Sequence, residues 1–510
     1  MNDSRLLIWD TISRLWKKVG DGFPMPISRV DGPGVDAFQR DRTSTPFGIF
    51  ESKFLSTRKR PQWEERLTGA IIVHGAVTGA GFSIGEVITG GTSGMTGTIT
   101  AKTASSVTFT TSNNDWTDGE TITGGTSAST AVITTHNTGS DIVYNYNGSS
   151  VLLNVGTVSG QRVIRQSVRY IPYVPGYSHH INTTGTMALG KVNQKQSILY
   201  GDDLNAIGFV MNGTEMSCLL RTNTSGSAVD TLVAQTDWNI DKLNGTGISG
   251  KTLNPTKSQI NDVDFQWLGI GRVRISLNID GSIHQVHEFN HANETTGVYM
   301  RTPTLPIRYE IENIGTVSSS STLEQICCAV SSEGGYTLPG DEYAASHTWA
   351  QEAAVTTRRP IFAIRLKAEF PAGKPNRKQV RLLDFACFVR TNDALFELMH
   401  VHNPLTVSAG GVPQALSVAW TSIDDDSCVE YLPNISAITA EHMHFVQSIF
   451  VPAATGNGGN TIEQSVASIN AHSFISQNFE SDNSQCFVIF ATSRTGTSNC
   501  IAHCSEIESE

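Results

Sequence analysis

The chain has 510 residues, of which 46 are glycine and only 16% are charged, and its formal net charge is −11. This length predicts two to four domains, and a composition rich in Gly, Ser, Thr and Asn is typical of all-β proteins with many turns. The thinly spread charge, without basic blocks between aromatic residues, argues against a nucleic-acid partner, and the lack of a long apolar stretch argues against a membrane partner.

The first twenty residues predict a short amphipathic helix. Ile8, Ile12, Leu15 and Trp16 recur at helical spacing, and the pattern ends at Gly20. Two tryptophans, Trp9 and Trp16, flank this stripe. A helix this short needs a surface to lie against. Packing on its own domain, docking on a neighbouring subunit and membrane association are the alternatives.

Residues 21–69 predict an extended arm, because glycine and proline interrupt the segment too often for regular structure to continue. An arm without a core of its own is usually held by partners. We therefore interpret residues 1–69 as a helix and arm that anchor the protein to neighbours. The candidate anchoring residues are Trp9, Ile12, Trp16, Phe38, Phe47 and Phe50.

Residues 70–138 contain an internal repeat. The segment GEVITGGTS at 85–93 returns as GETITGGTS at 119–127, and Ile99 and Ile133 close each copy at the same offset. Short Thr- and Val-rich strands between Gly-Gly turns predict a small two-repeat β module. A phosphate-binding role for these turns is a poor alternative, since neither a lysine nor the start of a helix follows them.

Residues 139–335 predict a jelly-roll-like β-sandwich. Residues 162–170 and 272–279 alternate with a period of two, and the second run leads into an Asp280-Gly281 turn and a returning strand at 283–289, which predicts a hairpin. Residues 336–510 predict a second, C-terminal β-rich domain, with strands near 361–370, 380–390, 416–422 and 486–492. The predicted fold class is therefore all-β.

Several segments of the middle region resemble a family of virion structural proteins of tailed bacteriophages, notably marine and cyanobacterial ones. The resembling segments are DWNIDKLNGTG at 237–247, FQWLGIGRVR at 265–274, HEFNHAN at 287–293, TPTLPIRYEI at 302–311, and the arm segments AFQR at 37–40 and TPFGIFESK at 45–53. The resemblance covers roughly residues 35–69 and 160–335. It implies membership of a virus particle, and the repeat module looks like an addition to the family's pattern. Since the N-terminus lacks the apolar core and cleavage site of a signal peptide, we expect the protein to be made in the host cytoplasm.

The candidate chemical sites are weak. The segment HEFNH at 287–291 matches the zinc-protease pattern HExxH, but that chemistry needs a helix, and here the motif ends a strand. The eight cysteines lack metal-type spacing and are expected to be buried free thiols. We therefore expect no catalytic residue, no metal, no cofactor and no enzymatic activity.

Aromatic residues near loops offer another kind of site. Tyr173 and Tyr177 lie in a proline-rich stretch, where their rings are candidates for glycan contact, against the plainer interpretation of packing under the sandwich edge. The main prediction is a virion structural protein on the tail, neck or head, assembled as a symmetric homo-oligomer with other virion proteins as partners. The alternative is a glycan-binding appendage that contacts the host surface.

Overall fold

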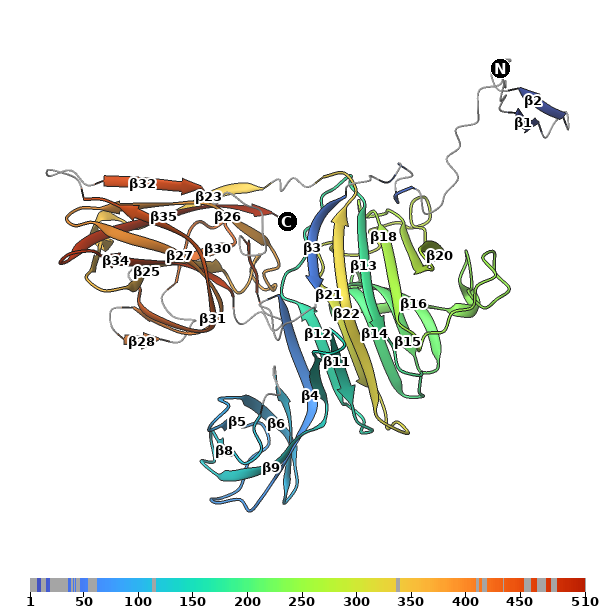
Figure 1. The fold of residues 1–510 in the computed structure, drawn as a ribbon, viewed down its shortest axis with the longest axis horizontal. Coiled ribbons are helices and arrows are strands. Elements are labelled where there is room, and N and C mark those ends of the chain that lie inside the picture. Colours follow the sequence, from blue (N-terminus) through green and yellow to red (C-terminus); the bar gives the residue numbers. More distant parts are fainter. Residues whose placement is uncertain are drawn as a thin grey trace.

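The computed structural model describes residues 7–10, 15–18, 35–37, 40, 42, 46–53, 62–111, 116–335, 340–409, 412–414, 420–433, 435–453, 460–465, 474–477 and 484–509 (Figure 1). Within these ranges the regular structure consists of strands and two short 3-10 turns, at Gln235–Asp237 and Trp349–Gln351. The all-β fold class is therefore confirmed. The described residues form no helix of the length and hydrophobicity that crossing a membrane would take.

The prediction of an N-terminal helix is wrong for the residues that the structure describes. Strands β1 (Leu7–Asp10) and β2 (Leu15–Lys18) form an antiparallel pair in which Trp9 lies opposite Trp16. An isolated helix of this length is marginal in water, because nucleation fixes several residues for one hydrogen bond. Branched and aromatic residues also favour strands, where they pair across the ladder. A helical period alone did not distinguish the two outcomes.

The middle sandwich consists of two antiparallel sheets. One has the strand order β10-β11-β22-β13-β18-β19-β20, with β3 also paired to β22, and the other has the order β17-β16-β15-β14-β21-β12-β4. The strands are β3 (Phe47–Lys53), β4 (Trp63–His74), β10 (Asp141–Asn145), β11 (Ser150–Val155), β12 (Arg162–Ser167), β13 (His179–Thr186), β14 (Gln194–Gly201), β15 (Ala206–Asn212), β16 (Glu215–Thr222), β17 (Val229–Ala234), β18 (Gln259–Phe265), β19 (Val273–Ile279), β20 (Ser282–Phe289), β21 (Ile307–Asn313) and β22 (Ser321–Ser332).

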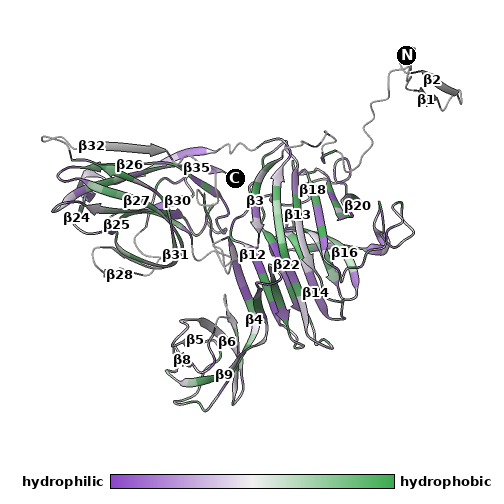
Figure 2. Ribbon diagram, viewed as in Figure 1, coloured by the Kyte–Doolittle hydropathy of each residue, from purple (hydrophilic) through white to green (hydrophobic). Residues whose placement is uncertain are grey.

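Alternation along these strands builds the core between the sheets. Ile181, Val263 and Ile275 point inward from one sheet and Phe209 and Tyr309 from the other, and all five are buried. Figure 2 shows hydrophobic and hydrophilic residues interleaved along the strands of this body. The predicted Asp280-Gly281 hairpin is confirmed between β19 and β20; both turn residues have positive φ, 55° and 77°, as a tight hairpin turn requires.

The repeat forms a closed barrel that shares one strand with the sandwich. Strands β4, β7, β6, β5, β8 and β9 pair in a ring that returns to β4. Strand β4 pairs with β12 of the sandwich through residues 63–68 before it enters the barrel, so it crosses the expected boundary at residue 69. Closure removes exposed sheet edges. The remaining barrel strands are β5 (Val87–Gly90), β6 (Thr96–Lys102), β7 (Ser106–Thr111), β8 (Thr121–Gly124) and β9 (Thr130–Gly139).

Each copy of the repeat closes the turn of the other copy. The Glu120 carboxylate accepts hydrogen bonds from the backbone N–H groups of Thr92 (3.0 Å) and Ser93 (2.9 Å). Glu86 accepts the equivalent bonds from Thr126 (3.2 Å) and Ser127 (2.9 Å). The reciprocal bonds explain why the glutamate and the GGTS turn recur together in the sequence.

A glycine is needed where each glutamate approaches the turn. A Cβ atom at Gly90 would lie 2.6 Å from Glu120 Oε2, and one at Gly124 would lie 2.6 Å from Glu86 Oε2. Burial alone would raise the pKa of the two carboxyls, but the backbone N–H groups of the turns hold the pKa of both below the ordinary value of 4.5. Both carboxylates are therefore charged acceptors in the folded module.

Substituting Glu120 with alanine is expected to destabilise the barrel by about 1–3 kcal/mol, because the N–H groups of Thr92 and Ser93 lose their charged acceptor. Hydrogen exchange of the β5 and β8 amides measures the change. Acidification should act in the same direction: the lowered pKa means that this stabilisation is complete above pH 4.5 and is lost as the pH falls through the folded-state value. Glu215→Ala, at an exposed hairpin position, is the matched control, and equal effects at both sites would contradict the prediction.

The C-terminal body is a second sandwich with its own buried clusters. Its sheets have the orders β23-β35-β26-β32 and β28-β27-β34-β25-β30-β29. In addition, β24 pairs with β35, β33 with β26 and β31 with β27. The strands are β23 (Asp341–Ser346), β24 (Ala353–Val355), β25 (Arg359–Leu366), β26 (Gln379–Val389), β27 (Ala394–Ala409), β28 (Val412–Gln414), β29 (Thr421–Ser422), β30 (Val429–Pro433), β31 (Ile435–Val451), β32 (Asn460–Ser465), β33 (Phe474–Ile475), β34 (Cys486–Ser493) and β35 (Ser498–Ser509). Two cation–π contacts join the sandwiches: Arg169 over Phe474 at 3.9 Å and Arg377 over Tyr170 at 4.5 Å.

Candidate functional site

The most elaborate polar site is the docking surface of the arm on the middle sandwich. Strand β3 pairs with the end of β22 from Cys327 to Ser332. Its Phe50 is buried against Trp63, with ring centroids 6.1 Å apart, and the Trp63 indole N–H donates to Ser52 Oγ at 2.8 Å. Residues 47–53 of the arm are therefore a structural strand of this chain's own sandwich.

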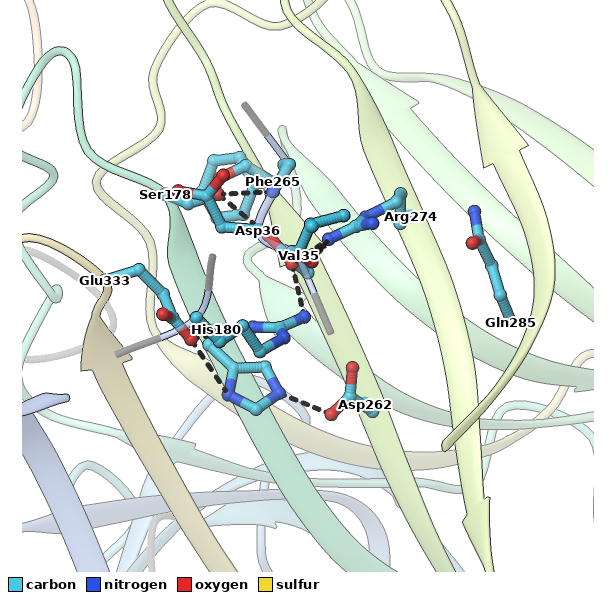
Figure 3. Close-up of polar contacts among 12 residues, drawn as sticks. Val35, Asp36, Ser178, His180, Asp262, Phe265, Arg274, Gln285 and Glu333 are labelled. Atoms are coloured by element: carbon cyan, nitrogen blue, oxygen red, sulfur yellow. Dashed lines mark hydrogen bonds and ion pairs between the residues drawn. The ribbon is translucent and has the colours of Figure 1, made fainter. Parts of the chain in front are cut away.

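A buried carboxylate holds the segment that precedes β3. Asp264 on β18 is 1% exposed and binds three groups. Nη2 of Arg42 and Nη2 of Arg274 each lie 2.5 Å from its Oδ2, and the Ser178 hydroxyl donates to its Oδ1 at 2.8 Å. The arm thus supplies one of the two arginines that compensate a charge inside the protein. Figure 3 shows Val35, Ser178 and Arg274 of this site beside Asp262, His180 and Glu333.

The backbone of residues 35–37 is fixed by the same side chains. Arg274 Nη2 donates to the Val35 carbonyl at 2.5 Å, and the Ala37 N–H donates to Ser178 Oγ at 3.2 Å. Val35, Asp36 and Ala37 are all buried. Arg274 therefore joins Asp264 to the arm, so docking of the arm and neutralisation of the carboxylate depend on each other.

A second group of charges adjoins Asp264. Asp262 is 1% exposed and binds the His180 ring through Nε2, and Glu333 accepts from Arg42 Nη1 at 2.7 Å. Burial alone would lower the pKa of His180 and raise that of Asp262, but their hydrogen bond and mutual charge raise the pKa of His180 and lower that of Asp262. When His180 is protonated, three carboxylates face three cations, so the arm closes an electrically balanced cluster.

Strand alternation places these charges on one face. Asp262 and Asp264 are two residues apart on β18 and point away from the core, while Val263 and Phe265 point into it. The ladder sets His180 and Arg274 opposite Asp264 on the neighbouring strands. Sequence reasoning missed this site. The available signal was charged residues at alternating positions within apolar strands, at Asp262, Asp264 and Arg274.

The predicted anchoring residues fall in different places. Phe50 lies in the chain's own core, and Phe47 at the start of β3 is 39% exposed. Trp9 and Trp16 are partners in the β1–β2 hairpin. Ile12 and Phe38 lie outside the described residues. The structure therefore places the four described residues in two different elements, a hairpin and a docked strand.

The two candidate glycan contacts also differ. Tyr173 is 6% exposed, its ring stacks on Phe265 at 5.8 Å, and its hydroxyl accepts from the Trp267 N–H at 3.0 Å. Its ring faces are covered by protein, so it has no face for a sugar. Tyr177 is half-buried beside Gly334, where a Cβ atom would lie 2.2 Å from its ring. The plainer interpretation, packing at the sandwich edge, describes Tyr173.

The other candidate chemical groups have structural roles. His287 Nδ1 accepts from the Asn239 N–H at 3.3 Å, and His291 bonds the Gly271 carbonyl through Nδ1 at 2.6 Å and stacks on Tyr299. All eight cysteines are free thiols, and all but the half-buried Cys327 are buried. Among the described residues, no three His, Cys, Asp or Glu side chains group in a way that would hold a metal ion.

Comparison with known proteins identifies no family for this chain. No family model and no curated protein matches it. Solved structures with some likeness include a family 43 glycoside hydrolase (TM-score 0.28, 11% identity, 64% of this chain and 48% of that one). Others are a family 16 glycosyl hydrolase from Mycobacterium smegmatis (0.29, 8%, 56% and 99%) and a legume lectin-like domain from Entamoeba histolytica (0.22, 12%, 38% and 88%).

The chain spans about half the length of the first of these proteins. TM-scores of 0.22–0.29 do not reach the level of a shared fold.

Proposed function

We propose that this protein is a structural component of a tailed-phage particle, built on a jelly-roll-like sandwich, which assembles as a homo-oligomer and is attached to other virion proteins through its N-terminal residues. The sequence segments at 37–53 and 237–311 that resemble virion proteins support the proposal. The functional surfaces are then contact surfaces between proteins, and the buried charge cluster is a structural device that holds the arm on the body.

The observation that carries the proposal is the difference between the part of the arm that is docked on the sandwich and the hairpin that precedes it. Residues 35–37, 40, 42 and 47–53 are built into the sandwich by the Asp264 cluster and by the pairing of β3 with β22. In contrast, the β1–β2 hairpin pairs with no other strand among the described residues. The docked segment is a fixed base, and we assign attachment to neighbours to the β1–β2 hairpin and the chain that leads from it, residues 1–34.

Deleting residues 1–34 is expected to leave a folded protein with an unchanged melting temperature that no longer enters particles. Deleting residues 1–60 should instead destabilise the middle sandwich by more than about 3–5 kcal/mol, the loss typical of removing one buried phenylalanine such as Phe50. Thermal unfolding of the two purified variants and their incorporation in a particle-assembly assay measure the difference.

The hairpin offers a milder variant with a matched control. Trp9→Ala with Trp16→Ala removes the cross-strand pair and should reduce incorporation without changing the melting temperature, while Trp349→Ala changes an exposed tryptophan on the C-terminal body. Normal incorporation of the chain that lacks residues 1–34 would refute the attachment role. A fully stable chain without residues 1–60 would refute the structural role of β3.

A further inference from the structure

The C-terminal sandwich carries a long strand with an open edge. Strand β31 has 17 residues and pairs with β27 on one side. Among the described residues, no second strand pairs with its other side. At about 3.3 Å per residue the strand is roughly 55 Å long. The Ile435 carbonyl at the start of the strand accepts from Arg359 Nη1 at 3.2 Å. Beyond it, this side of β31 is, among the described residues, a row of backbone donors and acceptors that another strand can pair with.

The usual protections of a sheet edge are few on this strand. Edges are commonly blunted by lysine, proline, inward-pointing charges or short length. The sequence of β31 has no lysine, arginine, aspartate or proline, and Glu441 is its single carboxylate. Register shifts against β27 interrupt the ladder, but His442–Phe445 and Gln447–Val451 remain regularly paired. The second of these stretches, Gln447–Val451, is suited to receive another strand.

Large apolar side chains are exposed along the same two stretches. Met443 is 36% exposed, Phe445 59% and Phe450 47%, and Leu395, which lies opposite Phe450 on β27, is 38% exposed. Contiguous exposed apolar groups of this kind mark interaction surfaces. They form one surface with the open edge of β31, so a partner strand would satisfy the backbone and cover the side chains together.

The patch continues a core that already exists beneath it. Met399 lies opposite Phe445 and Val401 opposite Met443 in the ladder, and both are buried in a cluster with Val488 and Phe490. The apolar cluster thus extends outward from β27 to the edge strand. Covering the exposed residues would extend this core across the edge.

We propose that a second copy of this chain covers the β31 edge, pairing antiparallel with the same edge about a two-fold axis. An antiparallel edge is self-complementary, because each residue that faces outward offers both its N–H and its C=O to the equivalent residue of the copy. The near absence of charge on β31 means that two identical strands meet little like-charge repulsion. The role of this pairing in a particle rests on the function proposed above, whereas the contact itself is a property of the purified chain.

Sedimentation of the full-length protein over a range of concentrations tests the contact. The wild-type chain is expected to be a dimer, or a larger even-numbered assembly. Phe445→Lys with Phe450→Lys should weaken self-association by at least about 30-fold, the loss typical of removing an interface hot spot. Ile248→Lys, at a position 89% exposed in the middle sandwich, is the matched control and should not change the mass. A monomeric wild type, or a double variant that associates normally, would overturn the proposal.

Single cysteines locate the axis independently of stability. In a Cys327→Ser background the remaining thiols are buried, so cysteines introduced at Met443, Phe445, Ser448 or Phe450 are the reactive ones. A residue near a two-fold axis meets its own copy, so at least one variant should form a disulfide-linked dimer on oxidation. A dimer that persists with no cross-link at any of the four positions would assign self-association to another surface.

The chain that lacks residues 1–34 separates this proposal from the attachment role. It should lose particle entry and keep the β31 dimer. If this variant enters particles and still dimerises, only the attachment role fails. If it is excluded from particles and is monomeric, only the β31 contact fails.

Discussion

Arg165→Met is expected to lower the free energy of unfolding by about 3–5 kcal/mol, because it leaves a buried carboxylate without its cation. Arg165 on β12 is 1% exposed and lies between the two sheets of the middle sandwich. Its guanidinium binds the Glu65 carboxylate of β4 and donates to Gln325 Oε1 of β22 at 2.8 Å. The Glu65 contact lies within one sheet, and the Gln325 bond joins that sheet to the other through the core.

The double variant Arg165→Met with Glu65→Met is the matched control. Removing both charges of a buried pair is often neutral, because the desolvation penalty disappears with the attraction. We therefore expect the second substitution to restore most of the lost stability. Urea unfolding that is monitored by hydrogen exchange of the β12 amides measures the stability of this body separately from that of the C-terminal sandwich. A single variant as stable as the wild type would contradict the expected role of the pair.

Asp264→Asn is expected to release the arm from the sandwich. The substitution keeps the shape of the side chain but leaves Arg274, which is 3% exposed, and Arg42 beside a neutral group. Removing one partner of a buried charge network costs about 3–5 kcal/mol. The segment at 35–42 contains Arg40 and Arg42, so trypsin cleavage after these residues measures its release directly.

We expect the Asp264→Asn protein to be cut in this segment at protease concentrations that leave the wild type intact. Asp280→Asn removes the carboxylate of an ion pair with Lys251 whose aspartate side chain is 77% exposed. Exposed pairs are screened by water and contribute little. This control should be cleaved as slowly as the wild type. Equal cleavage of all three proteins would show that the cluster does not hold the arm.

Local sequence rules accounted for the elements whose partners are close in the chain. The period-two runs at 162–170 and 272–279 became β12 and β19, and the Asp280-Gly281 pair formed the expected hairpin, because strand alternation and turn geometry depend on neighbouring residues. The repeat was also visible. Its closure was not, because the bonds of Glu86 and Glu120 cross from one copy to the other.

The N-terminal segment shows where the same rules failed. The apolar residues between Ile8 and Trp16 fit a helical period, yet the described residues form a hairpin with Trp9 opposite Trp16. In a short segment a few apolar positions match both periods. Which of the two forms is decided by cross-strand pairing, and no local pattern reports it.

The sequence by itself determined the all-β class, the repeat and the strands whose side chains alternate, because these follow from the chemistry of adjacent residues. Only the tertiary structure decided that the arm belongs partly to the sandwich. The three residues at its centre, Arg42, Asp264 and Arg274, are charged side chains of a kind usually left in water. They became a largely buried cluster because the arm meets two strands that lie more than 200 positions further along the chain, and the opposite charges neutralise one another there.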